Sequence, residues 1–324
     1  MKAANVINPF SPEFREAEKR GIFNFRALVI QKSVPCVAML TAEQIDSGTS
    51  ELHDKFKRAC DFMRFSLEDA FSASVGALQK CGFFPYSELA YEFNAFQSLL
   101  LEGYYKNTRD SMRRMLEVTL SAVVMLSEYK NVSDANKWVS SESEAPRFSS
   151  LVKILESNEL VNELNNRFEF SKRMKELYWN FCDYCHTRGI NYSTRVKHES
   201  DACISGVFIP KFIQEECGLV MEQFCATVGY LAVLLIVHNS ALLLPVDKES
   251  KWGLNGPISG FFSDGQVRDL FAVLPNGYAD FLKEYSKTNE GIVGLKEYFE
   301  QLPNLSDNDI KNQIQDFHRV FGGE

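Results

Sequence analysis

One apolar run in the last third of the sequence constrains the fold more than any other feature. Residues 224–237 carry no charged side chain, and the apolar pattern resumes at residues 241–244. Prolines at 210 and 245 bound the segment. The run is short for a membrane span, which needs about 20 apolar residues, and is typical of the central helix of a globular bundle. We therefore expect a buried core helix over about 212–244, and no association with a membrane.

The rest of the sequence repeats the helical period. From about 50 to 80, apolar residues recur every three or four positions, as on the buried face of a helix. Further helices are predicted over 12–31, 87–104, 106–130, 147–166, 169–187 and much of the tail after 265. Pro35 is expected to end the first helix, and Ser306 with Asp309 to cap a helix in the tail. Since no useful stretch alternates as a strand would, the sequence predicts an all-α protein, a multi-helix bundle of long antiparallel helices around the central apolar helix.

Three contiguous domains are expected along the chain. Residues 1–49 would form an N-terminal helical extension, residues 50–246 a helical core domain, and residues 247–324 a C-terminal helical subdomain packed on the core. The second boundary falls at the start of a glycine-rich connector, residues 247–265.

Charge and cysteine usage limit the location and the partners of the chain. The formal net charge is −8, so nucleic acid could bind only through a local basic patch, such as Arg188, Arg195 and Lys197. The eight cysteines lie mostly among apolar residues, which favours reduced thiols over a disulfide framework. The first residues lack the apolar run of a signal peptide. We expect a cytoplasmic protein that binds a protein partner or forms a homodimer.

A cysteine- and histidine-rich stretch over 176–203 suggests two cofactors. Cys182, Cys185 and His186 match the attachment signature of c-type haem. That attachment takes place outside the cytosol, and Cys185 falls on the apolar stripe of the predicted helix 169–187, so we expect a core cysteine and no haem.

Zinc is the better metal hypothesis. Cys182, Cys185, His198 and Cys203 have the number and spacing of ligands in a tetrahedral structural site. The first pair lies inside a predicted helix, however, and the residues before His198 lack the apolar anchors of a zinc finger. The sequence therefore predicts no cofactor, with a structural zinc site as the alternative.

The predicted helix 106–130 carries a row of charged side chains. Arg109, Arg113 and Glu117 are spaced by four residues along the edge of its buried face, while Asp110 faces away. One interpretation is a solvated row of ion pairs, each contributing a few tenths of a kcal/mol. The other places Arg113 and Glu117 in a polar cleft opposite His186.

A resemblance supports the second interpretation. The pattern consists of a glycine, Arg-x3-Glu on one helix and Tyr-x3-Cys-x3-His on another, at Gly103, Arg113, Glu117, Tyr178, Cys182 and His186. Over about residues 90–190 the chain thereby resembles a group of bacterial all-helical proteins that is similar to the HEPN superfamily. That superfamily includes RNases and components of toxin and phage-defence systems. The resemblance implies a metal-independent RNase in which Arg113, Glu117, Tyr178 and His186 share a cleft. His186 would act as general acid or base and Arg113 would stabilise phosphate charge.

The chain departs from the catalytic HEPN pattern at one point. In that pattern an arginine precedes a histidine by four to six residues, and none of the five histidines here has an arginine at that distance. Arg113 and His186 would have to meet across two helices. The sequence therefore predicts first a non-catalytic helical module, an interaction or defence-associated component. The RNase is the alternative, and a structural zinc-binding protein the second alternative.

Overall fold

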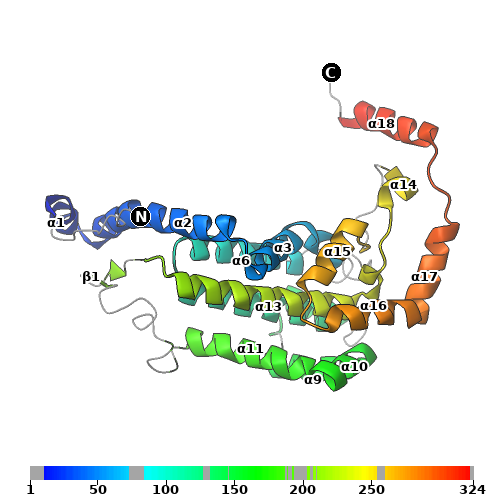
Figure 1. The fold of residues 1–324 in the computed structure, drawn as a ribbon, viewed down its shortest axis with the longest axis horizontal. Helices are drawn as coiled ribbons and strands as arrows, with labels where there is room; N and C mark the ends of the chain where they lie inside the picture. The colour runs from blue at the N-terminus through cyan, green and yellow to red at the C-terminus, as the bar shows by residue number, and fades with distance from the viewer. Residues whose placement is uncertain are drawn as a thin grey trace. The chain divides into compact units, whose positions relative to one another are not determined.

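The computed structural model describes residues 11–72, 84–126, 132–144, 146–186, 188, 192, 203–204, 207–208, 210–253 and 260–321. They form an all-α, multi-helix bundle, which confirms the predicted fold class (Figure 1). The first half holds α1 (Pro12–Lys19), α2 (Ile22–Ser47), α3 (Glu51–Phe65), α4 (Leu67–Ser72), α6 (Phe84–Leu101), α7 (Tyr105–Leu126), α8 (Val132–Val139) and α9 (Phe148–Leu155). The second half holds α10 (Glu159–Phe168), α11 (Phe170–Cys185), α13 (Gln214–His238), the 3-10 helix η2 (Ser240–Leu243), α14 (Lys248–Trp252), α15 (Asp264–Val273), α16 (Tyr278–Thr288), α17 (Glu290–Gln301) and α18 (Asp307–Phe321). A short antiparallel hairpin of β1 (Cys203–Ile204) and β2 (Val207–Phe208) precedes α13.

The chain divides into two compact units, each built from three separate segments. The first unit consists of Met1–Phe56, Tyr91–Met115 and Lys175–Thr227. The second unit consists of Lys57–Ala90, Leu116–Met174 and Val228–Glu324. Long helices such as α7 and α13 contribute residues to both units. The units are therefore defined by packing between distant segments, and the three contiguous domains expected from the sequence stay a prediction.

The first helix of the chain ends just before a glycine, and not at the proline expected from the sequence. Gly21, with a φ of +113°, separates α1 from α2, whereas Pro35 lies inside α2. Proline cannot donate to the carbonyl four residues before it, which here belongs to Gln31. Both Pro35 and Gln31 are exposed, so water can bond that carbonyl and the helix continues. The prediction that Pro35 ends the helix is wrong.

The helix caps and the central helix agree with the predictions. The Ser306 amide donates to Asp309 Oδ2 at 3.0 Å, and the Asp309 amide donates to Ser306 Oγ at 3.3 Å. This reciprocal pair is the predicted capping box, and it begins α18. The most apolar stretch of α13 is 78% buried, which confirms a buried core helix.

Aromatic rings form the core of the first unit around Phe224 of α13. Its ring is stacked 4.2 Å from the ring of Phe96 and 5.9 Å from that of Phe93. The ring of Phe56 lies 5.3 Å away in a tilted arrangement. Such pairs contribute about 0.5–1.5 kcal/mol each beyond the area that they bury. They hold α3, α6 and α13 together beside the polar groups described next.

Candidate functional site

Arg109 of α7 lies at the centre of a buried polar network in the first unit. Its side chain is 0% exposed. Nη2 lies 3.0 Å from Glu216 Oε2, Nε donates to Gln223 Oε1 at 2.9 Å, and Nη1 donates to the Tyr105 carbonyl at 2.9 Å. The guanidinium carbon lies 4.2 Å from the centroid of the Tyr184 ring, a cation–π distance. The prediction that Arg109 stands at a solvated edge is wrong, because α11 and α13 cover that edge.

Further hydrogen bonds extend this network between helices. Gln223 Nε2 donates to Asn180 Oδ1 on α11 at 3.2 Å. The Tyr105 hydroxyl accepts from the Ile213 amide at 3.0 Å, and burial raises the pKa of this hydroxyl above its ordinary value. Each buried polar group bonded in this way avoids the cost of an unpaired one. The network ties α7, α11 and the start of α13 together, and its central guanidinium is closed to solvent.

Asp110, the next residue on α7, is the centre of a second polar group. It accepts from Cys185 Sγ at 3.1 Å, from Arg113 Nε at 3.2 Å and from Arg114 Nη2 at 2.7 Å. Burial by itself raises the pKa of Asp110, but the Cys185 hydrogen bond and the two arginines outweigh it and leave that pKa below its ordinary value. The prediction that Asp110 faces away is wrong, since it bonds to α11.

Cys185 is a hydrogen-bond donor in this group. Burial, and next the contact with Asp110, raise the pKa of its thiol to about 12. A thiol with that pKa stays protonated at neutral pH, whereas nucleophiles and metal ligands are thiolates. Cys185 therefore binds Asp110 as a neutral thiol.

The four residues predicted to form a catalytic cleft lie in different surroundings. Arg113 is half-buried and engaged with Asp110, while Glu117 is half-buried one turn further along α7. Tyr178 is buried, with its ring 5.3 Å from the ring of Trp179. His186 is exposed just past the end of α11, and its ring makes no hydrogen bond or ion pair with the described part of the chain. The structure brings Arg113 together with Asp110 and Cys185, and the catalytic role of the four residues stays a prediction.

Gly103, the glycine of the resemblance, has a structural role. Its φ is +77°, which favours glycine. A Cβ atom at this position would lie 2.8 Å from the Lys211 carbonyl oxygen. The glycine therefore allows the turn between α6 and α7 to approach the segment before α13.

Only half of the predicted zinc site can be placed. Cys182 is buried and Cys185 bonds to Asp110, while His198 and the side chain of Cys203 lie outside the described residues. So do Arg195 and Lys197 of the predicted basic patch. Among the residues that the structure describes, no group of three or more His, Cys, Asp or Glu could hold a metal ion. The zinc site stays a prediction.

An exposed apolar face on α2 was missed in the sequence. Phe23 is 86% exposed and Met39 is 62% exposed, with Ile30 also on the surface. By length and composition, α2 and α13 are the two described helices that could cross a membrane, but only 28% of the apolar stretch of α2 is buried. The sequence does show a long apolar segment here, since Arg26 and Lys32 are the only charged residues between positions 22 and 42. The segment was not recognised as one helix because Pro35 was expected to end it.

The two charged side chains of this segment are engaged within the first unit. Arg26 Nη2 donates to the Tyr104 hydroxyl, and its guanidinium lies 5.9 Å from the centroid of that ring. Lys32 Nζ lies 3.3 Å from Glu13 Oε1. Lys32 nevertheless remains 45% exposed. The exposed surface of α2 from Phe23 to Met39, called here the α2 face, winds around the helix and is apolar in large part, with Lys32 as its exposed charged residue.

Comparison with known proteins identifies no relative of the chain. No family model, no curated protein and no solved structure matches it. The resemblance to HEPN-related proteins thus rests on its own motif residues and stays a prediction.

Proposed function

We propose that the chain is a non-catalytic helical interaction module that binds a second copy of itself through the α2 face. The observation that carries this proposal is the exposure of Phe23, at 86%, with the exposed Ile30 two turns further along the same side of the helix. Exposed, contiguous apolar surface on a folded protein marks contact with another protein or with lipid.

A protein partner fits the α2 face better than lipid. The opposite side of α2 packs within its own unit, where the rings of Phe25 and Phe14 lie 5.6 Å apart, so lipid could not surround the helix. Arg26 and Lys32 would also have to enter the hydrocarbon. The net charge of −8 opposes adsorption to anionic headgroups.

A second copy of the chain is the partner that we propose. Two chains of net charge −8 repel one another, so apolar contacts of the α2 face have to hold the dimer together. In a twofold dimer the same face serves both copies. The 26 residues of α2 span about 39 Å, with Cys36 near the middle. An antiparallel pair that crosses near Cys36 would bring the two Cys36 residues close to each other.

The polar groups of the first unit support the absence of catalysis. Arg109 is enclosed, and Asp110 holds Arg113 and Cys185. A catalytic arginine or thiol must instead reach the substrate. The described contacts of these groups are those of helix packing.

Sedimentation equilibrium over a range of concentrations tests the proposal. We expect the wild-type chain to have twice the mass of 36.9 kDa, and Phe23→Glu and Met39→Glu each to weaken dimerisation about thirtyfold or more. Tyr91→Glu is the matched control, because Tyr91 is also exposed and aromatic but lies on α6. A monomeric wild type, or α2 variants as dimeric as the control, would overturn the proposal. Pelleting with phosphatidylglycerol vesicles, lost in both α2 variants, would assign the face to lipid instead.

A further inference from the structure

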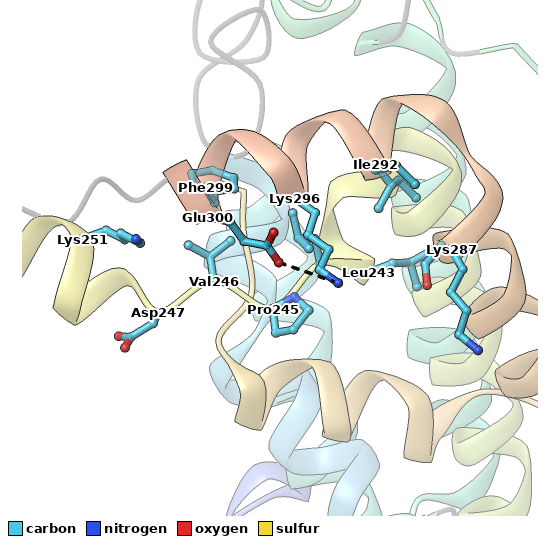
Figure 2. Close-up of a pocket in the computed structure, with 13 residues that line it drawn as sticks. Leu243, Pro245, Val246, Asp247, Lys251, Lys287, Ile292, Lys296, Phe299 and Glu300 are labelled. Carbon is cyan, nitrogen blue, oxygen red and sulfur yellow. Dashed lines mark ion pairs between the residues drawn. The ribbon is translucent and has the colours of Figure 1, made fainter. Parts of the chain in front are cut away.

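A pocket of about 570 Å³ lies in the second unit, beside α17 (Figure 2). The chain segment from Leu243 to Asp247 forms one side, and α17 with the end of α16 forms the other. The segment is held in place because the Val246 amide donates to the Phe262 carbonyl at 2.8 Å. The 3-10 helix η2, just before it, packs against both α16 and α17. The pocket is thus bounded by elements that hold one another in position.

The inner walls of this pocket are apolar. Leu243, Val246, Ile292 and Phe299 line it and are themselves buried, while the ring of Pro245 is exposed toward it. Pockets of some 300–1,000 Å³ with apolar walls and a few polar groups are typical of small-molecule sites. Both the size and the lining therefore suit a small molecule with an apolar body.

Two lysines on one side of the pocket hold only weak partners. Lys296 Nζ lies 3.9 Å from Glu300 Oε1, and Lys287 Nζ lies 3.6 Å from Glu284 Oε2. All four side chains are largely exposed, so water screens both pairs. These ammonium groups can exchange such partners for a ligand anion at little cost.

The other charged groups of the rim have defined partners. Lys251 Nζ donates to the Leu302 carbonyl, and Asp247 Oδ1 accepts from the Ser250 amide at 3.0 Å as the cap of α14. Figure 2 shows Asp247 and Lys287 at opposite sides of the group, with Lys296 and Pro245 between them. Lys287 and Lys296 are therefore the ammonium groups of the pocket that are least engaged by the chain.

We propose that this pocket binds a small amphipathic carboxylate. Its apolar chain lies against Val246, Phe299 and Pro245, and its carboxylate meets Lys287 and Lys296. Glu284 and Glu300 pair only weakly with these two lysines, so the ligand carboxylate takes their place at the ammonium groups. Each lysine presents a point charge, which can pair with one oxygen of a carboxylate without the planar fork of arginine. This site is independent of the α2 face.

Dodecanoate, kept below its micelle concentration, is the probe that tests the site. The Trp252 ring lies 5.7 Å from the Phe299 ring, so binding should change the fluorescence of Trp252, and Trp252→Phe identifies that signal. We expect saturable binding of one dodecanoate per chain by titration calorimetry. Dodecanol, which lacks the charge, and acetate, which lacks the chain, should bind at least tenfold more weakly.

Variants of the rim and of the wall complete the test. The double variant Lys287→Ala/Lys296→Ala should weaken dodecanoate binding about tenfold or more, since two charge-assisted contacts are lost. Val293→Glu, which places a charge in the half-buried wall, should abolish it, with circular dichroism confirming the helical fold. Lys311→Ala on α18 is the control and should bind as the wild type does. Binding of dodecanol equal to that of dodecanoate, no saturable binding, or a double lysine variant equal to Lys311→Ala would each overturn the proposal.

Discussion

Two regions of the first unit depart from the usual distribution of side chains in opposite ways. Around Arg109 a full charge is buried, whereas on the α2 face a phenylalanine ring is exposed. Arg109 is balanced inside the chain by Glu216, Gln223 and a backbone carbonyl. The ring of Phe23 is left almost uncovered by the described part of the chain. A buried charge that is balanced within the chain thus stabilises the fold, while an exposed apolar ring that nothing covers indicates a partner outside it.

Removal of the buried charge should produce the largest effect. Arg109→Met removes the ion pair with the largely buried Glu216 carboxylate and should lower the free energy of unfolding by about 3–5 kcal/mol. Urea denaturation at one protein concentration measures it. The double variant Arg109→Met/Glu216→Leu should recover much of the loss, because both buried charges are then replaced by apolar side chains. A loss below about 1 kcal/mol in the single variant would show that the network is not a compensated buried pair.

Changes on the α2 face should show the opposite behaviour. Phe23→Glu should leave the free energy of unfolding of the monomer within about 0.5 kcal/mol of the wild-type value, since the side chain is exposed, but should weaken the dimer about thirtyfold or more. Mild oxidation at a concentration that favours dimers should join two chains through Cys36, as seen by non-reducing electrophoresis. Cys36→Ser should remove the covalent dimer and keep the non-covalent one. Cross-linking that persists in Cys36→Ser would contradict the antiparallel arrangement.

The Asp110 group should make a smaller and pH-dependent contribution. Its folded-state pKa lies below the ordinary value, so the stability that it adds is present above the unfolded pKa of about 4 and is lost as the pH falls through the folded pKa. Asp110→Asn should therefore destabilise the protein at pH 7, and the difference from wild type should shrink toward pH 3. Cys185→Ala should lower the free energy of unfolding by about 1 kcal/mol at pH 7. An Asp110→Asn effect that stays equal at both pH values would contradict a lowered pKa.

For the alternative function as an RNase, we expect no cleavage of RNA. Incubation of the wild type with total RNA and a chelator should leave the RNA intact, as should His186→Ala and Arg113→Ala. Cleavage by the wild type that both variants lose would establish a metal-independent RNase and would place Arg113 and His186 in one site.

The sequence was sufficient for the helices because helix formation depends on neighbouring residues. The period of apolar residues, the apolar run of α13 and the cap formed by Ser306 and Asp309 are all local signals. They predicted the all-α class and most of the helix positions. Pro35 misled the prediction because the cost of a proline depends on whether water reaches the freed carbonyl.

Only the tertiary structure decided which sides of those helices meet. The spacing along α7 placed Arg109 at the edge of a buried face, and an edge becomes interior when α11 and α13 cover it. The pocket beside α17 likewise joins Leu243–Asp247 to residues of α16 and α17. Burial and pocket formation are properties of segments far apart in the sequence, and no local pattern of side chains records which segments those are.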